Sequence, residues 1–129
     1  MARVPDDLRY TPDHEYARPT TERGVVLVGI TDYAQGELGD VVFVNLPKPG
    51  DQLSARQTFG TIEAVKAVAD LYAPVAGAVL EANSGLDADP AAVNRDPYGE
   101  GWMIRLRADN PADLDGLLTP DAYRAHIGG

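Results

Sequence analysis

The sequence predicts a mainly β protein built as a sandwich of two similar halves. Short β-like runs of Val, Ile, Leu and aromatic residues recur along the 129-residue chain, and Pro, Gly and Asp separate them. A weak internal repeat supports the two halves: GDVVFVN at residues 39–45 matches GAVLEAN at residues 77–83, at an offset of 38 residues. We therefore expect two β-rich halves joined by a tight turn at one end of the molecule.

The first half of the chain contains four expected strand regions and one helix. LRY at 8–10 and EYAR at 15–18 flank the turn-like TPDH, and VVLVGI at 25–30 is a continuous apolar run typical of a buried strand. TDYAQGELG predicts a short helix with Thr31 or Asp32 as N-cap and Gly39 as its stop. VVFVNL at 41–46 predicts the next strand, which the turn PKPGD ends.

The second half continues the pattern and ends in a helical tail. Residues 57–63 and 70–73 look like two strands around AVKAVA, and VAGAVLEAN at 75–83 predicts another strand, with Gly77 marking a bend or a close backbone approach. DADPAAVNR predicts a helix with Asp89 as N-cap, and WMIRLR at 102–107 predicts the final strand. Asn110-Pro111 and Thr119-Pro120 each predict a helix start. We expect Phe43 and Trp102 in the core.

The length, charge and composition of the chain exclude several classes of function. One domain over residues 1–129 fits this length, with a core at about 24–107 and a helical tail at about 110–127. The net charge of −9 argues against nucleic acid and anionic membranes as partners. The chain has no cysteine, no apolar run of membrane-spanning length and no secretory signal, so we expect a cytoplasmic protein.

The chain lacks the usual parts of an enzyme. Its two serines, Ser54 and Ser84, lie in no nucleophile elbow, and it contains neither a P-loop nor a GxGxxG motif. His14 and His126 stand at opposite ends of the sequence without metal-ligand spacing, so we expect no metal site. An independent catalyst is therefore the poorer interpretation.

Lys66 is the residue that suggests a function. The chain has two lysines and nine arginines, and Lys66 lies in TIEAVKAVAD between the two expected strands, among small or apolar neighbours. Arginine would supply the same charge, but only lysine offers a primary amine that can form an amide. An exposed hairpin tip would present that amine to a modifying enzyme. The alternative is an ordinary solvated turn residue, which is how we interpret Lys48.

Nearly the whole chain resembles the glycine cleavage system H protein family. The resemblance rests on YTPDHEY (10–16), VGITDYAQGELGDVVFVNLPKPG (28–50), TIEAVKAVADLYAPVAGAVLEAN (61–83) and VNRDPYGEGWMIRLR (93–107). It implies a barrel-sandwich hybrid fold of the lipoyl/biotinyl-carrier type, with lipoate in amide linkage on Lys66 and with Glu63, Val65 and Ala67 forming the recognition turn. Ala64, Ala69 and Tyr16 replace residues common in the family with others of similar size or kind.

The resemblance also implies a non-catalytic shuttle. The lipoyl arm takes the aminomethyl group of glycine from the glycine decarboxylase (P protein) to the aminomethyltransferase (T protein), and dihydrolipoamide dehydrogenase (L protein) reoxidises it. Lipoate-attaching enzymes are further implied partners, and we expect a monomer. A cleft beside DHEY would protect the loaded arm, and we hypothesise that Glu15, with Asp13 or Asp70, accepts its ammonium group. Alternatively, the acids of DHEY are ordinary surface residues.

Three other functions compete. The same lysine would serve a donor that passes lipoate to 2-oxoacid dehydrogenase subunits. A biotin carrier would share the fold, but it usually has methionines beside the lysine, where this chain has Val65 and Ala67. A purely structural adaptor would require Lys66 to stay unmodified.

Overall fold

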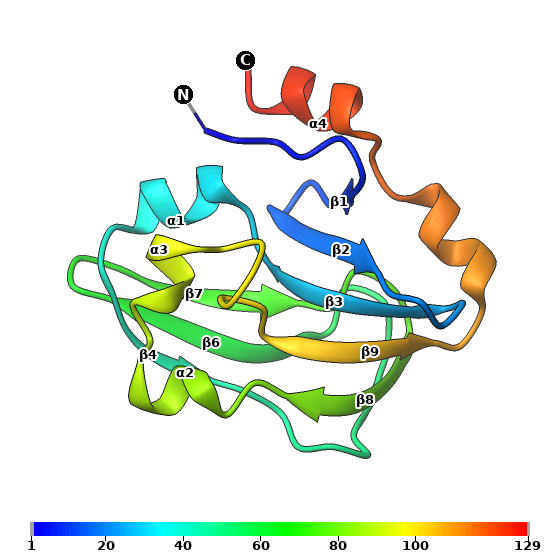
Figure 1. The fold of residues 1–129 in the computed structure, drawn as a ribbon, viewed down its shortest axis with the longest axis horizontal. Coiled ribbons are helices and arrows are strands. Elements are labelled where there is room, and N and C mark those ends of the chain that lie inside the picture. The colour runs from blue at the N-terminus through cyan, green and yellow to red at the C-terminus, as the bar shows by residue number, and fades with distance from the viewer. Residues whose placement is uncertain (1, 129) are drawn as a thin grey trace.

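A computed structural model describes residues 2–128, and it has two antiparallel β-sheets (Figure 1). The six-stranded sheet has the order β1 (Arg9–Tyr10), β2 (Glu15–Pro19), β3 (Val25–Ile30), β9 (Ile104–Ala108), β8 (Gly77–Ala82) and β5 (Gln52–Leu53). The three-stranded sheet has the order β4 (Val41–Asn45), β6 (Thr58–Ala64) and β7 (Val68–Tyr72). The predicted mainly β architecture is confirmed.

The main core fills the space between these sheets. Its buried side chains are nearly all aliphatic, as expected of strands that turn one face toward a second sheet. They include Val26, Val28 and Ile30 from β3, Val41 and Val44 from β4, Ile62 from β6, Leu71 from β7, and Ile104 and Leu106 from β9. This core holds the two sheets together and packs the hairpin of β6 and β7 against the six-stranded sheet.

The two copies of the weak internal repeat lie in different sheets. β4 contains the first copy and pairs with β6, whereas β8 contains the second and pairs with β9 and β5. Gly77 marks a close backbone approach, as predicted: a Cβ atom there would lie 2.3 Å from the Arg107 carbonyl oxygen. Gly39, its counterpart in the repeat, has a different role, because its φ of 81° ends a helix.

Helix α1 (Asp32–Leu38) begins and ends as predicted. The Thr31 hydroxyl accepts a hydrogen bond from the Ala34 amide, and the Gly39 amide donates to the Gln35 carbonyl. The predicted helix over DADPAAVNR is instead two short helices, α2 (Gly85–Ala88) and α3 (Ala92–Arg95). The prediction of Asp89 as N-cap is wrong, because Asp89 follows α2 as its C-cap and its carboxylate pairs with Arg95.

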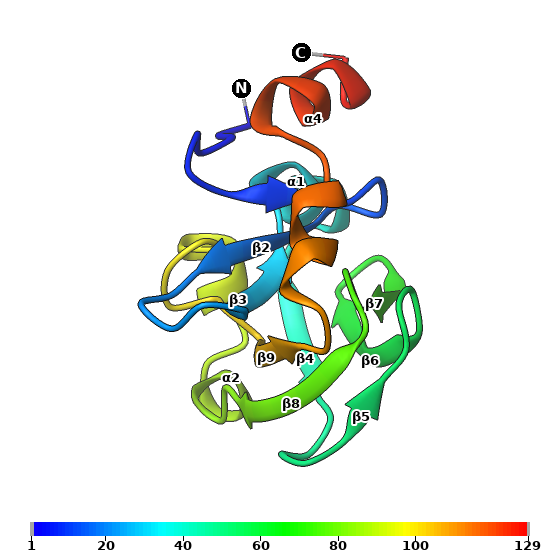
Figure 2. The same cartoon turned by 90° about the vertical axis from the view of Figure 1, so that its right-hand side faces the viewer.

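The tail packs against the N-terminal strands (Figure 2). It contains a 3₁₀ helix, η1 (Pro111–Gly116), and helix α4 (Pro120–His126), and Asn110 and Thr119 cap them as predicted. Tyr10 exchanges two backbone hydrogen bonds with Leu118. A second buried cluster under the tail contains Leu8, Tyr10, Tyr16, Tyr98 and Tyr123. The tail is therefore packed as part of the fold.

The prediction that Phe43 and Trp102 lie in the core is wrong. Phe43 is 49% exposed and Trp102 is only half-buried. A β-bulge between Val41 and Phe43 shifts the register of β4 against β6. Strict alternation would turn Phe43 to the same face as buried Val41, but the bulge leaves both Val42 and Phe43 on the outside.

Candidate functional site

Lys66 lies at the tip of the β6–β7 hairpin, which projects from one end of the molecule (Figure 1). Glu63 and Val68 form the last strand pair, and the Ala64 amide donates to the Ala67 carbonyl across the turn at 2.8 Å. The Val65 amide donates to the Asp40 carbonyl at 3.0 Å, which attaches the tip to the junction of α1 and β4. The turn is therefore exposed, yet two backbone hydrogen bonds hold it in place, one across the hairpin and one to Asp40.

The stem of the Lys66 side chain lies over Gly39. A Cβ atom added to Gly39 would be 3.2 Å from Lys66 Cε and 3.8 Å from its Nζ, so the missing side chain leaves room for the stem. Among residues 2–128, Lys66 takes part in no ion pair. Lys66 is exposed, so its amine is available to a reagent from outside. The side chains next to it in the turn are small enough to let an enzyme approach.

The other three residues of the predicted recognition turn surround Lys66. Val65 is 75% exposed and Glu63 is exposed on the adjoining strand. Ala67 is half-buried and contributes the carbonyl that closes the turn. The structure thus brings all four residues of this prediction together at one tip.

A cleft of about 270 Å³ begins next to the hairpin. Helix α1 forms one wall and the β6–β7 pair the other, with the β1–β2 turn at the far end. The lining is mostly apolar with several acids: Asp13, His14, Glu15, Ile30, Tyr33, Ala34, Glu37, Leu38, Ile62, Ala69, Asp70 and Leu71. Leu38 directly precedes Gly39, on which the Lys66 stem rests, so a chain attached to Lys66 has a short path into the cleft.

Glu15 is the buried acid of this cleft, with 2% of its surface exposed. The Thr11 hydroxyl donates a hydrogen bond to its carboxyl group at 3.2 Å. Burial raises the pKa of Glu15 from 4.5 to about 8, and the hydrogen bond from Thr11 offsets part of that increase. A carboxyl group with this pKa is largely protonated at neutral pH and gains its charge when a cation approaches.

Asp13 and Asp70 are placed differently from Glu15. Asp13 lines the cleft but already pairs with Arg56, at 2.8 Å between Nη2 and Oδ2. Asp70 also borders the cleft, although it is exposed and alternates along β7 with buried Leu71. Alternation turns its side chain toward the outer face of the sheet. Of the three acids, Glu15 is the one that the fold buries in the cleft.

The sequence indicated no contact between His14 and other parts of the chain, but the structure places several aromatic side chains beside it. His14 and His126, from opposite ends of the chain, have ring centroids 5.5 Å apart. His14 Nδ1 and the Tyr123 hydroxyl lie 2.9 Å apart, and that hydroxyl lies 2.7 Å from the Thr31 hydroxyl. Burial lowers the pKa of His14, and the neighbouring His126 lowers it further. This chain of hydrogen bonds ties the tail to the cap of α1.

Sequence reasoning missed the wall that α1 contributes to the cleft. Tyr33, Ala34, Glu37 and Leu38 all line it. Their spacing of one, four and five residues puts them on one face of the helix, and that face could have been found as an amphipathic signal. Nothing in the sequence indicated that the face would turn toward β7.

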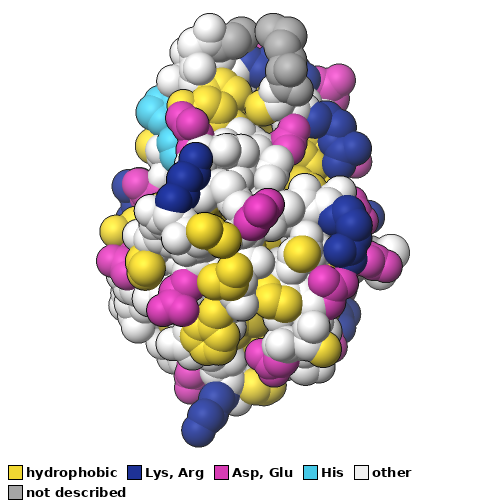
Figure 3. All heavy atoms as spheres, turned by 90° about the vertical axis from the view of Figure 1, so that its left-hand side faces the viewer, with side chains coloured by type: hydrophobic (Ala, Val, Ile, Leu, Met, Phe, Trp, Pro, Cys, Tyr) yellow, Lys and Arg dark blue, Asp and Glu magenta, His cyan; other side chains and the backbone are white. Residues whose placement is uncertain are grey.

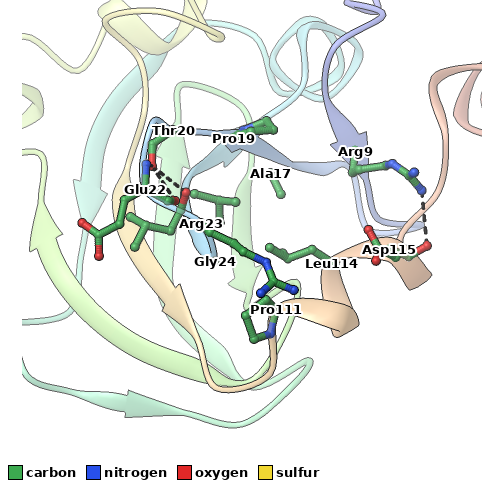
Figure 4. A pocket seen from close by; sticks show the side chains of 12 residues that line it. Arg9, Ala17, Pro19, Thr20, Glu22, Arg23, Gly24, Pro111, Leu114 and Asp115 are labelled. Atoms are coloured by element: carbon green, nitrogen blue, oxygen red, sulfur yellow. Dashed lines mark hydrogen bonds between the residues drawn. The ribbon is translucent and has the colours of Figure 1, made fainter.

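A second hollow, of about 310 Å³, lies away from these residues, between the β2–β3 turn and η1 (Figure 4). It contains none of the predicted site residues. Arg9, at its edge, already donates to the Asp115 and Leu117 carbonyls. Since the buried acid lines the cleft and the Lys66 stem lies over Gly39, next to Leu38 of the cleft wall, we place the site there.

Within residues 2–128, no group of three or more His, Asp or Glu side chains is arranged to hold a metal ion. The helices of this part of the chain are all too short or too polar to cross a membrane.

The comparisons with known proteins agree over nearly the full length. The family model described as "Glycine cleavage H-protein" matches residues 8–128. A glycine cleavage system H protein from Chlorobium limicola is 57% identical over 125 residues, which cover 97% of this chain and 98% of that protein. The H protein from Bacteroides fragilis is 52% identical over 123 residues, 95% of this chain and 96% of that one.

A solved structure extends the agreement to the fold. The crystal structure of a glycine cleavage system H protein from Mycobacterium marinum has a TM-score of 0.88 with this chain at 40% sequence identity. The match covers 98% of this chain and 100% of the other. The predicted barrel-sandwich hybrid fold is therefore confirmed. With its fold, its sequence and its length in agreement, this chain belongs to the glycine cleavage H-protein family.

Proposed function

We propose that Lys66 is the residue that carries the lipoyl group in this chain. Proteins of this family carry lipoate on a lysine, and the chain is a lipoyl carrier of the glycine cleavage system without catalytic activity of its own. The observation that supports Lys66 is its place at an exposed, anchored hairpin tip beside the cleft. Lys48, the other lysine, lies in the turn between β4 and β5 and lines no part of that cleft.

The cofactor supplies the sulfur chemistry that carries the aminomethyl group of glycine, and the protein supplies attachment and protection. The anchored turn fixes the starting point of the arm, so that the arm searches a limited volume and reaches its partners at a high effective concentration. The apolar walls of the cleft exclude water from whatever enters it. Glu15 would meet a cationic amine there and gain its negative charge as the amine approaches.

Intact-mass measurement tests the attachment site. We expect protein from a lipoate-competent host to carry one lipoyl group, the Lys66→Arg variant to carry none, and the Lys48→Arg variant to match the parent. An adduct that persists in Lys66→Arg, or one that disappears in Lys48→Arg, would remove Lys66 from this role. A biotinyl mass in place of the lipoyl mass would support the biotin-carrier alternative.

The role of Glu15 is tested separately. The rate at which the aminomethyl group is lost from the arm to water should rise in Glu15→Ala relative to the parent. Asp70→Asn is the matched control, because Asp70 borders the same cleft with an outward side chain. Equal loss rates in Glu15→Ala and the parent would exclude Glu15, and an equal rise in Asp70→Asn would assign the effect to charge in general.

The carrier acts with the P, T and L proteins of the glycine cleavage system. We infer that it does so as a monomer that binds each enzyme weakly and that it works in the cytoplasm. The net charge of −9 would speed encounters with basic surfaces, so added salt should lower the association rate with the P protein. A salt-independent rate would argue against this steering.

Donation of lipoate to 2-oxoacid dehydrogenase subunits is an alternative function of the same lysine. A lipoate-transfer assay with those subunits would test it.

A further inference from the structure

Two residues other than glycine have a left-handed backbone within residues 2–128, and both lie beside the acids of the cleft. His14 has a φ of 72° and Arg56 has a φ of 67°. His14 directly precedes Glu15, and the side chain of Arg56 pairs with Asp13. Residues with a Cβ atom disfavour this conformation, so they keep it only where their surroundings fix it, often at functional sites.

The backbone of Arg56 is held by the residue that follows β7. The Arg56 amide donates to the Ala73 carbonyl at 2.9 Å, and the Ala73 amide donates to the Gln57 carbonyl at 2.8 Å. Within the turn, the Gln57 amide donates to the Ser54 carbonyl at 3.1 Å. Arg56 therefore projects from a fixed turn between β5 and β6, and its side chain starts from a defined position.

The side chain of Arg56 reaches a different part of the fold. Its Nη2 atom lies 2.8 Å from Asp13 Oδ2, in the turn between β1 and β2 at the end of the cleft away from Lys66. The Arg56 side chain is 56% exposed and that of Asp13 is 28% exposed. An ion pair with this exposure adds little to stability, and the left-handed backbone costs at least as much. Stability alone therefore does not account for arginine at this position.

Asp13 and Glu15 are two acids of one turn, and both line the cleft. An amine that binds buried Glu15 lies in a low dielectric and away from water, whereas solvent weakens an ion pair at the partly exposed Asp13. Figure 3, which faces the Lys66 end, shows further acidic side chains over the outer surface. Binding at Glu15 therefore requires that the nearest competing carboxylate, Asp13, be kept from the amine.

We propose that Arg56 is a positioning residue of the cleft: it occupies the Asp13 carboxylate and so leaves Glu15 as the acid that meets the amine of the loaded arm. This proposal rests on the proposed attachment at Lys66 and on the proposed role of Glu15. It adds the residue that decides between the two acids. Arg56 itself lines no part of the cleft, so it acts through Asp13 and does not touch the arm.

Arg56 and Asp13 also act on the charge of Glu15 in opposite directions. Burial is the main reason that the pKa of Glu15 is raised; the Asp13 carboxylate adds to the increase, and the Arg56 guanidinium opposes it. An unpaired Asp13 would therefore compete for the amine and also make Glu15 less ready to become charged. The other titratable groups around Glu15, which the variants below leave unchanged, are His14 in the same turn, Tyr33 and Glu37 on α1, Asp70 on β7 and Tyr123 on α4.

Loss of the aminomethyl group to water breaks the bond between its carbon and the sulfur of the arm. The sulfur leaves with the electron pair and takes up a proton, and with one water molecule the group becomes formaldehyde and ammonium. The nitrogen lone pair assists this step, and a protonated amine has none to offer. A carboxylate that keeps the amine protonated therefore slows the loss, and it does so better in a dry cleft than in water.

The first measurement is the rate of formaldehyde release from the lipoylated chain after the P protein has loaded it with glycine. Arg56→Gln removes the charge and keeps the strained backbone, and we expect it to release formaldehyde about three- to fivefold faster than the parent. Arg56→Lys keeps a cation that can pair with Asp13 and should stay within about 1.5-fold. Arg56→Gly relieves the backbone but has no charge, so it should behave like Arg56→Gln.

A double variant separates positioning from simple bracing of the two turns. If Arg56 acts by occupying Asp13, then Arg56→Gln/Asp13→Asn has no competing carboxylate, and its release rate should return to within about 1.5-fold of the parent. A brace between the turns is broken equally in Arg56→Gln, in Asp13→Asn and in the double variant. A double variant as fast as Arg56→Gln would therefore overturn the proposal.

The second measurement uses the unlipoylated chain and so needs no arm. Carboxyl-carbon NMR gives the titration midpoint of Glu15, which should rise in Arg56→Gln, fall in Asp13→Asn and return toward the parent value in the double variant. Loss of a brace would instead let water into the turn and lower the midpoint in both single variants. Equal midpoints in Arg56→Gln and the parent would contradict the electrostatic link.

Arg107→Gln is the matched control. The Arg107 side chain is 55% exposed and pairs with Glu22 at 2.6 Å, but it lines no part of the cleft. Its release rate and its Glu15 midpoint should equal those of the parent. If both change as much as in Arg56→Gln, the effect belongs to net charge and the proposal is overturned. Circular dichroism and thermal unfolding would show that all variants are folded before rates are compared.

The outcomes also separate this proposal from the two on which it rests. If the parent chain carries no lipoyl mass at Lys66, the attachment proposal fails. If Glu15→Ala loses the aminomethyl group no faster than the parent, the role of Glu15 fails. If Glu15→Ala is faster but Arg56→Gln equals the parent, only the positioning by Arg56 fails.

Discussion

The buried carboxyl group of Glu15 should make the stability of this protein depend on pH in an unusual direction. In the folded chain the pKa of Glu15 is about 8, because burial disfavours the charged form, whereas its ordinary value is 4.5. Between these two pH values the unfolded chain has lost the proton that the folded chain still holds. Folding is therefore disfavoured progressively as the pH rises from 4.5, and the effect is complete above about 8.

The magnitude follows from that interval. One pH unit corresponds to about 1.36 kcal/mol, so the span from 4.5 to 8 amounts to about 5 kcal/mol. Glu15→Gln removes the titration but keeps the shape and an oxygen that can accept the bond from Thr11. We expect the free energy of unfolding of Glu15→Gln, relative to the parent, to increase by about 5 kcal/mol between pH 4.5 and pH 9.

Urea unfolding of both proteins at pH 4.5, 6, 7, 8 and 9 measures this difference. Groups that do not interact with Glu15 titrate equally in both proteins, so they cancel in the comparison. Asp70→Asn serves as a control, since Asp70 borders the same cleft but is exposed and has no part in the pKa shift of Glu15. If the curves of Glu15→Gln and the parent stay parallel within about 1 kcal/mol from pH 4.5 to 9, the carboxyl group is not held protonated and the reasoning fails.

Three further predictions concern the supports of the site. Thr31→Ala should lower the free energy of unfolding by about 1–2 kcal/mol in urea unfolding, because it removes the helix cap and the contact with Tyr123, whereas Thr31→Ser should recover most of it. Gly39→Ala should cost about 1 kcal/mol or more, since its φ is 81°, and should also slow lipoylation by displacing the Lys66 stem; a normal rate would contradict the second claim. His14 should titrate below pH 6.5 in NMR spectra, and a midpoint at or above 6.5 would contradict its burial.

Much of the fold could be predicted because local signals agreed with it. The apolar run at 25–30 became β3, and the cap residues Thr31, Asn110 and Thr119 begin their helices as expected. The hairpin around Lys66 was also predicted, from two strand-like runs on either side of a short turn. Such features depend on residues close in sequence, where propensity and capping act directly.

The remaining features depend on contacts between distant residues. The bulge that exposes Phe43 arises where β4 meets β6, and no local pattern marks it. The proximity of His14 and His126 requires the tail to pack on the first strands. Asp89 precedes a proline, like a typical cap, yet the chain forms a turn there and α3 begins two residues later than Pro90. These are tertiary outcomes that a single sequence does not specify locally.

The attachment of the Val65 amide to the Asp40 carbonyl has a consequence for recognition kinetics. A loop that is disordered before binding loses backbone entropy when an enzyme grips it, at about 1–2 kcal/mol for each residue that becomes fixed. Here the three turn residues between the strands are already held in place, so that loss was incurred when the chain folded. A ligase can thus recognise the tip on first contact, and it can release the finished product without the loop having to relax.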